Sequence, residues 1–475
     1  MEFDKDLLAR QEARTLAKQA EVAQNALSRM SQEKLDAIVE AVARAFSEEA
    51  AALAQLAVEE TGFGNTADKI TKNRFASETV AAAIRNMKTV GLLREDREHK
   101  LWEIGVPVGV IAAIVPSTNP TSTVCYKALI ALKSGNAILF SPHPKALRAT
   151  RAAVKVVADA ARDAGAPSGA VSCLTIPSLQ GCQELMSAPQ VRLILATGGP
   201  GMVKAAYSSG KPAIGVGAGN GPAYIHHSAD VRQAISHILR SKTFDNGTVC
   251  ASEQSMIVEK SLEDTVLREA QSQGFYLMNP QEAGQLAKLL FKPNGALSPD
   301  VVGKTALHLA QMAGFTVPEG TKILLARERE AGPSVPYSME KLCPVLAFYV
   351  MDNEDSVLEK VVEVLTHEGS GHTFAMHCTD EALIRKFAAK VPVSRFLVNT
   401  PAALGGIGQS TGLFPALTLG CGAVGGSSSS NNISPLDLIN IRRVAWGTEA
   451  PPQAKSEIPA DLLERLTAKI LERLK

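Results

Sequence analysis

The sequence predicts an α/β protein with two domains, each built on a largely parallel sheet. Continuously apolar, β-branched runs such as 108–115 alternate with helical segments, which is the pattern of repeated βαβ units. Apolar residues fill these runs without alternation, as expected for parallel strands that are covered on both faces. The pattern reaches 222–225, and a second series of the same kind follows. We therefore expect a ligand-binding cleft between two α/β domains, at the carboxyl ends of their strands.

The first domain is expected to start with helices and to continue as alternating strands and helices. The first ninety residues are rich in Ala, Glu, Gln, Lys and Arg, with apolar residues at helical spacing. Strands are expected at 108–115, 136–140, 170–176 and 191–196, and helices at 121–133, 145–164, 179–186 and 202–208.

The second series has the same texture, with a helix expected at 230–244. Its strands are expected at 253–258, 322–326, 345–351, 373–377 and 396–399. Two further strand-like segments, 100–106 and 440–446, lie outside both series. Paired with each other, they would form a small arm that is suited to an oligomer contact.

The C-terminal residues have a different character. Residues 447–457 form a linker rich in Pro, Ala, Lys and Ser, and 459–475 predict a helix that begins with a proline. One apolar stripe runs along that helix between charged residues: Leu463, Leu466, Ile470 and Leu474. Such a helix either packs on its own oligomer or docks on a partner, and the sequence does not distinguish the two.

Composition excludes several classes of protein. The 475 residues include 49 Lys and Arg against 48 Asp and Glu, a balance that removes the electrostatic case for nucleic-acid or membrane-surface binding. No apolar run is long enough to cross a bilayer, and the acidic N-terminus does not resemble a signal peptide. We expect a cytoplasmic protein. Its seven cysteines, an odd number without a Cys-x-x-Cys pair, do not predict a disulfide framework.

Three short motifs suggest ligand chemistry but fail in their context. Residues 420–425 match G-x-G-x-x-G, yet serines rather than a helix follow them. His367 and His372 are five residues apart in a glycine-containing turn, so no metal site of the His-Glu-x-x-His kind is expected. Residues 303–305 resemble the end of a P-loop, but Ser298 stands where the first glycine belongs. We expect no metal.

Two residues remain as candidates for chemistry. Cys250 lies between a helix and the strand expected from Glu253, in a loop that contains Asn-Gly, and such loops often carry reacting groups. Asn119 follows the first strand and precedes a proline, so its amide could point into the cleft as an oxyanion donor. Each taken alone is more often structural.

Several stretches resemble the aldehyde dehydrogenase superfamily, and more narrowly its CoA-acylating branch. They are 115–122, 140–144, 196–217, 241–254, 340–344 and 417–426, and the resemblance extends over residues 5–447. It implies two Rossmann-like domains and a β-arm for oligomerisation. The implied division is a cofactor-binding domain of 1–99 and 108–222, a catalytic domain of 223–430, an arm of 100–107 with 431–447, and a linker with an amphipathic helix at 448–475.

The resemblance also implies roles for individual residues. Cys250 matches the nucleophile, Asn119 the oxyanion donor, and Glu340 the glutamate that holds the nicotinamide ribose. The other cofactor-binding positions it implies are Phe140, Ser141, Pro142, Thr197, Gly198, Gly199, Gly217, Leu419 and Gly420. The helix start after Gly199 suits a pyrophosphate, because free backbone N–H groups and the helix dipole favour an anion.

A missing general base separates two possible activities. Hydrolytic relatives activate water with a glutamate in a segment resembling Glu-Leu-Gly-Gly-Lys-x-Pro. The matching segment here, 215–222, is glycine-rich, and no carboxylate occurs between Lys211 and Pro222. A CoA thiolate is then expected to take the acyl group from the thioester on Cys250. The predicted activity is reversible, NAD(P)-dependent oxidation of a short aldehyde to its acyl-CoA. The alternative is a hydrolytic aldehyde dehydrogenase that releases the free acid.

The expected cofactor is NAD, with NADP as the alternative, and coenzyme A is the co-substrate. Where many relatives have Lys-Pro-x-Glu, residues 141–144 read Ser-Pro-His-Pro, and a missing carboxylate tolerates a 2′-phosphate. The candidate substrates are acetaldehyde, propionaldehyde and sulfoacetaldehyde. An anionic tail would need a cation; Arg395 and Lys127 are candidates by type, although both are expected at the surface or in salt bridges.

The expected assembly is a homodimer or homotetramer. Some acylating dehydrogenases of bacterial microcompartments carry a similar linker and helix as a cargo signal, so 459–475 either binds a shell or packs on its own oligomer. A different class of function is also open, namely a non-catalytic dinucleotide-binding or scaffolding protein that uses this helix. Loss of the Cys250 thiol would leave such a protein functional.

Overall fold

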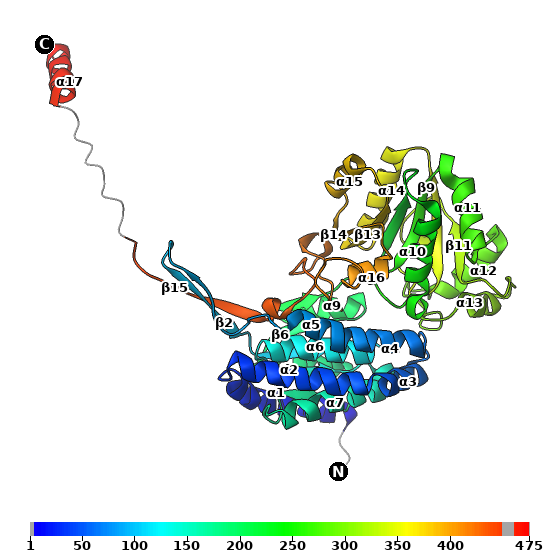
Figure 1. Cartoon of the computed structure of the whole chain (residues 1–475), viewed down its shortest axis with the longest axis horizontal. Coiled ribbons are helices and arrows are strands. Elements are labelled where there is room, and N and C mark those ends of the chain that lie inside the picture. The colour runs from blue at the N-terminus through cyan, green and yellow to red at the C-terminus, as the bar shows by residue number, and fades with distance from the viewer. Residues whose placement is uncertain (1–3, 449–459, 475) are drawn as a thin grey trace.

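The computed structural model describes residues 4–448 and 460–474, and it contains the two expected α/β domains (Figure 1). The first domain holds a parallel sheet of order β5-β4-β3-β6-β7. Its strands are β3 (Val110–Ile114), β4 (Ile138–Ser141), β5 (Val171–Cys173), β6 (Val191–Ala196) and β7 (Ala213–Gly215). Its helices are α1 (Lys5–Leu27), α2 (Gln32–Glu48), α3 (Ala50–Thr61), α4 (Thr66–Arg74), α5 (Val80–Ile84), α6 (Pro120–Lys133), α7 (Leu147–Asp163), α8 (Leu179–Ser187) and α9 (Pro200–Tyr207).

The second domain is a seven-stranded parallel sheet of order β10-β11-β12-β9-β8-β13-β14. Its strands are β8 (Gly221–Ile225), β9 (Glu253–Glu259), β10 (Phe275–Leu277), β11 (Ile323–Arg327), β12 (Val345–Met351), β13 (Gly371–His377) and β14 (Val393–Val398). Its helices are α10 (Val231–Thr243), α11 (Glu263–Ser272), α12 (Pro280–Leu290), α13 (Ala306–Ala313), α14 (Glu354–His367), α15 (Glu381–Ala388) and α16 (Ala402–Gly406). The central strands are buried along their length, which explains their unbroken apolar sequences.

The two predicted outlying strands pair with each other, as expected. They are β2 (Leu101–Pro107) and β15 (Ile439–Ala445), which run antiparallel. A third strand that the sequence analysis missed, β1 (Gly91–Asp96), pairs with the other edge of β2. It therefore belongs to the arm sheet and not to the first domain. Its charged and largely exposed side chains carry no apolar pattern, which is why it gave no strand signal.

The expected location of the cleft is correct for the first domain and wrong for the second. Asn119 and Thr197 follow the carboxyl ends of β3 and β6, but Cys250 and Glu340 precede the amino ends of β9 and β12. The physical reason is the connection between the domains. The chain leaves β7 at Gly215 and enters β8 only six residues later, so the carboxyl edge of one sheet faces the amino edge of the other.

The C-terminal helix is also confirmed, as α17 (Ala460–Arg473), and its described residues are exposed. Pro459 and nearly all of the predicted linker lie outside the described residues. Across the described segments, no helix combines the length and the apolar character needed to span a bilayer.

Candidate active site

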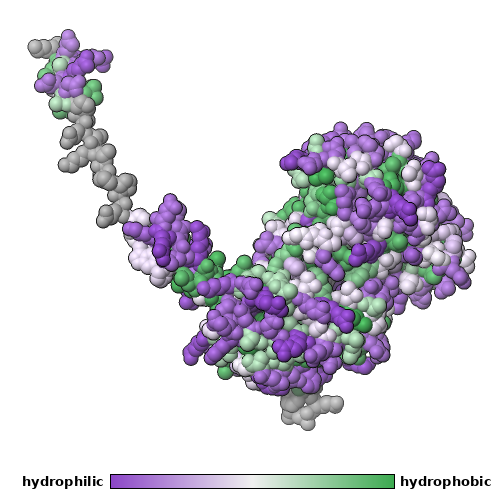
Figure 2. Space-filling view, in the orientation of Figure 1, coloured by the Kyte–Doolittle hydropathy of each residue, from purple (hydrophilic) through white to green (hydrophobic). Residues whose placement is uncertain are grey.

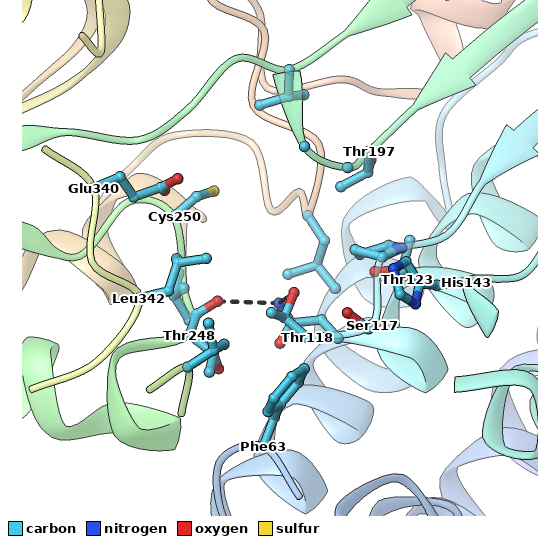
Figure 3. A pocket seen from close by; sticks show the side chains of 18 of the residues that line it. Phe63, Ser117, Thr118, Thr123, His143, Thr197, Thr248, Cys250, Glu340 and Leu342 are labelled. Carbon is cyan, nitrogen blue, oxygen red and sulfur yellow. Dashed lines mark hydrogen bonds between the residues drawn. The ribbon is translucent and has the colours of Figure 1, made fainter. Parts of the chain in front are cut away.

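A cavity of about 490 Å³ lies between the two domains, and most of the predicted site residues line it (Figure 3). Those that line it are Asn119, Thr197, Gly198, Gly199, Gly217, Cys250, Glu340 and Leu419. Four others do not: Phe140, Ser141, Pro142 and Gly420 are buried behind the cavity wall. His143 and Lys145, which follow the end of β4, line the cavity in place of the strand end itself.

Cys250 lies in the loop between α10 and β9, as the sequence predicted. Upstream of it, Asp245 and Asn246 have φ values of 48° and 52°, a left-handed conformation that is uncommon for residues other than glycine. Burial raises the pKa of the Cys250 thiol to about 12, with Glu340 and Cys421 adding to the rise and Arg395 opposing it. The resting residue is therefore a thiol, and it must lose its proton before it can attack.

Asn119 is the residue before the first turn of α6, and its side chain makes no capping bond to that helix. Its Nδ2 donates to the carbonyl oxygen of Thr248, in the Cys250 loop, over 3.3 Å and to Thr118 Oγ1 over 3.2 Å. Its Oδ1 accepts a 2.6 Å hydrogen bond from Lys72 Nζ. The amide nitrogen is thereby directed toward the side of the cavity that holds Cys250.

Glu340 lies beside Cys250 in the cavity (Figure 3). Its Oε1 accepts a 2.9 Å hydrogen bond from the Gly219 N–H. Burial raises the pKa of Glu340 to about 8, and the nearby Glu368 adds to the rise, while the Gly219 N–H, Lys242 and Lys341 oppose it. At neutral pH this carboxyl is therefore protonated. Among the described residues that line the cavity, it is the only carboxyl group.

The glycine-rich segment 215–222 passes directly against the nucleophile. A Cβ added at Gly219 would lie 1.8 Å from the Cys250 carbonyl oxygen. By contrast, a Cβ at Gly217 would meet its nearest atom only at 3.9 Å. Glycine is thus required at 219 by close backbone approach, which gives the sequence motif a steric cause.

The nucleotide end of the cavity has features that fit a dinucleotide. Gly198 and Gly199 lead into α9, and a Cβ added at Gly199 would meet nothing within 4 Å. The Thr197 hydroxyl is buried and has no hydrogen-bond partner among the described residues. A phosphate could take both this hydroxyl and the Gly201 N–H at the start of α9, since the Met202 and Val203 N–H groups already donate to the Gly199 carbonyl oxygen.

Arg395 and Lys127 are not surface or salt-bridge residues, so that expectation is wrong. Arg395 is 2% exposed, and its guanidinium donates to carbonyl oxygens that include those of Gly371 and Gly420, at 3.2 and 2.6 Å. Lys127 is fully buried and donates to the Ile114 and Leu195 carbonyl oxygens. Burial lowers the pKa of Lys127 to about 7. Both side chains thus donate mainly to backbone carbonyl oxygens, and Arg395 Nε has no hydrogen-bond partner among the described residues.

The sequence analysis missed a buried ion cluster next to the cavity. Lys69 and Lys72 of α4 both contact Asp245 Oδ2, at 2.9 and 2.5 Å. Lys72 also lines the cavity. No local pattern predicts this cluster, because the lysines and the aspartate are more than 170 residues apart.

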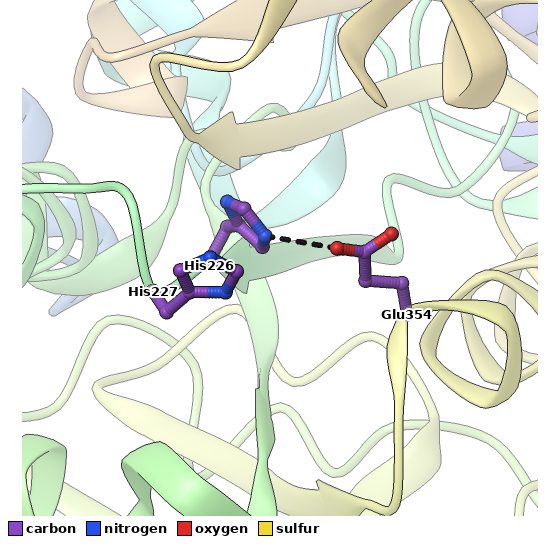
Figure 4. Close-up of side chains that lie close together, drawn as sticks. All are labelled: His226, His227 and Glu354. Atoms are coloured by element: carbon purple, nitrogen blue, oxygen red, sulfur yellow. Dashed lines mark hydrogen bonds and ion pairs between the residues drawn. The ribbon is translucent and has the colours of Figure 1, made fainter. Parts of the chain in front are cut away.

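A second polar cluster lies at the opposite, carboxyl edge of the second sheet, where His226, His227 and Glu354 come together (Figure 4). Their potential ligand atoms lie within 4.8 Å of one another, a set that sequence spacing did not indicate. His226 Nε2 faces Glu354 Oε1 at 3.2 Å, and its Nδ1 lies 2.8 Å from Ser228 Oγ. Both ring nitrogens thus have partners in the protein, and the cluster is explained as a hydrogen-bonded cap on β8.

Residues 6–279 match the aldehyde dehydrogenase family. The chain belongs to this family. It is 45% identical over 443 residues to the bifunctional aldehyde-alcohol dehydrogenase of Escherichia coli K12, and that match covers 92% of this chain and 50% of the relative. The chain thus spans about half the length of the curated relatives it matches first.

Solved structures of family members match the whole architecture. An acetylating aldehyde dehydrogenase from Geobacillus thermoglucosidasius matches with a TM-score of 0.92 and 47% identity, covering 95% of this chain and 99% of that one. A propionaldehyde dehydrogenase from Rhodopseudomonas palustris, solved with bound CoA and an acylated cysteine, matches with a TM-score of 0.83 and 28% identity. That match covers 91% of this chain and 97% of the other. The predicted resemblance to the acylating branch is confirmed.

Proposed function

We propose that this chain oxidises a short aldehyde to its acyl-CoA with NAD or NADP, through a thioester on Cys250. One observation carries the proposal: Cys250 faces a cavity whose only described carboxyl, Glu340, already accepts the Gly219 N–H and has a pKa that burial raises to about 8, so that most of it is protonated at pH 7. The adjacent segment 215–222 contributes no carboxylate either. Water near the thioester therefore has no base to activate it, and a CoA thiolate resolves the intermediate instead.

In the proposed mechanism Cys250 Sγ, once deprotonated, bonds to the aldehyde carbon. The Asn119 amide and the Cys250 backbone N–H stabilise the negative charge that develops on the former carbonyl oxygen; losing one such donor typically costs about 100- to 1000-fold in rate. When bound, the nicotinamide supplies a hydride acceptor. Thr197, Gly198 and Gly199 are the residues that would hold the phosphates of its dinucleotide, and Glu340 its ribose.

The hydrolytic alternative requires a general base near Cys250, and a neutral Glu340 does not supply one at pH 7. The relatives with acetylating activity and with bound CoA support the acylating route. NAD is the proposed cofactor. NADP is tolerated because residues 141–145 contain no carboxylate to repel a 2′-phosphate, while His143 and Lys145 line the cavity there.

The cavity favours an uncharged substrate such as acetaldehyde or propionaldehyde over sulfoacetaldehyde. Arg395 and Lys127 do not line the cavity, and both donate to backbone carbonyl oxygens. Lys72 lines the cavity, but its three N–H groups already have acceptors. The remaining lysine in the described lining, Lys145, lies at the proposed nucleotide end beside His143, whose pKa burial lowers.

One assay tests this function. NADH formation is followed with acetaldehyde, propionaldehyde and sulfoacetaldehyde, with and without CoA, and with NAD or NADP. Turnover should require CoA, yield acyl-CoA and disappear in Cys250→Ala. NADH and free acid formed at the same rate without CoA would show the hydrolytic enzyme, and unchanged function of Cys250→Ala would show a non-catalytic protein.

We further propose that the arm joins copies of this chain. Large apolar side chains are exposed on it, including Trp102, Ile441, Val444 and Trp446, and the two tryptophan rings lie 4.9 Å apart. A dimer or tetramer would cover this surface. The double substitution Ile441→Lys and Val444→Lys should reduce the mass measured by light scattering to that of a monomer. An unchanged mass would place the interface elsewhere.

For α17 we propose docking on a partner surface, with a microcompartment shell protein as the candidate. Apolar and charged residues occupy this helix together (Figure 2). Leu463, Leu466 and Ile470 are each at least half exposed. A reporter fused to 448–475 should co-purify with shell proteins. Failure to do so would leave packing on the chain's own oligomer.

A further inference from the structure

The buried cluster beside the cavity links three separate elements. Lys72 lies on α4, Asn119 at the start of α6, and Asp245 in the loop that leads to Cys250. Lys69 and Lys72 are 3% and 5% exposed, and Asp245 is fully buried. These groups are out of water, so their orientation is set by one another.

Lys72 has no donor left for a substrate. Its ammonium contacts Asn119 Oδ1 at 2.6 Å, Asp245 Oδ2 at 2.5 Å and Thr248 Oγ1 at 3.1 Å. A lysine ammonium has three N–H groups, so all are engaged. Although Lys72 lines the cavity, it can act on the reaction only through the groups that it holds.

The contact with Asn119 determines which way the amide faces. An ammonium donates and cannot accept, so the amide atom facing Lys72 must be the oxygen. The Asn119 NH₂ group must then face the Cys250 loop, where its present bonds to Thr248 and Thr118 are long, at 3.3 and 3.2 Å. The positive charge at Oδ1 also polarises the amide and makes its N–H groups better donors.

Asp245 fixes the position of Lys72 relative to the nucleophile. Its carboxylate accepts from Lys69, Lys72, Thr248 Oγ1 and the Asn65 N–H. These bonds hold the left-handed conformation of Asp245 and join the Cys250 loop to α4 across the domain boundary. The same cluster therefore sets the separation between the amide donor and the sulfur.

We propose that Lys72 is a positioning residue for the oxyanion donor: by binding Asn119 Oδ1 and Asp245 together, it aims the Asn119 N–H at the oxygen of the Cys250 adduct. This inference rests on the proposed aldehyde chemistry at Cys250. It assigns no proton transfer and no substrate contact to Lys72.

A double-mutant cycle tests the inference. In the wild-type background, Lys72→Met should lower kcat/KM for the aldehyde at least tenfold, while KM for CoA stays unchanged. In the Asn119→Ala background, Lys72→Met should lower kcat/KM less than about twofold, because the amide donor that Lys72 positions is gone. Lys69→Met is the comparison variant: it loses the 2.9 Å bond to Asp245 and the 2.8 Å bond to the Thr118 carbonyl oxygen but no contact with the Asn119 side chain. The loss of kcat/KM that it causes should therefore depend less on Asn119 than the loss caused by Lys72→Met.

Two further measurements separate positioning from other roles. Lys72→Gln keeps a donor for Asn119 Oδ1 and should lose less activity than Lys72→Met. If Lys72→Met does not fold, Lys72→Gln takes its place in the double-mutant cycle. Alkylation of Cys250 by iodoacetamide needs no oxyanion donor, and its rate should be unchanged in folded Lys72 variants. The inference would be overturned if Lys72→Met lowered kcat/KM equally in the wild-type and Asn119→Ala backgrounds. It would also be overturned if alkylation of Cys250 slowed in proportion to the lost activity. Because NADH formation is the readout with or without CoA, failure of the acylating proposal would not obscure this result.

Discussion

The close approach of the glycine-rich segment to the nucleophile makes Gly219→Ala a sharp test of the site. An alanine Cβ there would lie 1.8 Å from the Cys250 carbonyl oxygen, whereas real Cβ atoms essentially never come within 3.0 Å of another heavy atom. The two segments must therefore separate by at least 3.0 − 1.8 = 1.2 Å. The oxygen belongs to the backbone and the position of a Cβ is fixed by the backbone, so no side-chain rotation can relieve the contact.

The expected consequences follow from that displacement. Overpacking of a tight interior typically costs on the order of 1–3 kcal/mol of folding free energy. A shift of about 1 Å at reacting groups can lower the rate about 100-fold. Withdrawal of the segment also breaks the 2.9 Å bond from the Gly219 N–H to Glu340. We therefore expect Gly219→Ala to lose both stability and activity.

The assay pairs thermal unfolding with CoA-dependent NADH formation. Gly217→Ala serves as the control for unfolding, because its added methyl group meets nothing closer than 3.9 Å and its melting temperature should equal that of the wild type. A Gly219→Ala variant with wild-type stability and activity would refute the close approach. So would equal destabilisation of the two variants, because the effect would then not come from contact with Cys250.

Two further predictions concern the charges of the site. With CoA withheld, free-acid release should be slow at pH 7 and about fivefold faster at pH 8, because burial raises the pKa of Glu340 to about 8 and only the ionised carboxylate can activate water. Glu340→Gln should remove that rise, and a rise that persists would exclude Glu340 as its source. Asp245→Asn leaves Lys69 and Lys72 buried without the carboxylate that they share. The free energy of unfolding, measured by chemical denaturation, should therefore fall by on the order of 3–5 kcal/mol. A loss below about 1 kcal/mol, the value of an exposed pair, would show that the cluster is not buried in solution.

The fold could be predicted from the sequence because its signals are local. Apolar strands separated by helices indicated both parallel sheets. The strands that were missed are β7 and β10, of three residues each, and the six-residue β1 of the arm. The Cys250 loop and Asn119 were found because they lie in contiguous motifs. The sequence did not predict that the amino edge of the second sheet faces the cleft, because that orientation depends on how β7 connects to β8.

The sequence by itself determined the order of the elements, the position of Cys250 in its loop and the absence of a carboxylate from 215–222, since each is a property of neighbouring residues. Only the tertiary structure decided the protonation of Glu340 and the contacts of Lys72. Burial sets the pKa of a carboxyl, and burial depends on the whole fold. Lys72 contacts Asn119 and Asp245, which are 47 and 173 residues away in the sequence. Hydrophobic periodicity predicts only local structure, so it cannot indicate contacts between residues so far apart.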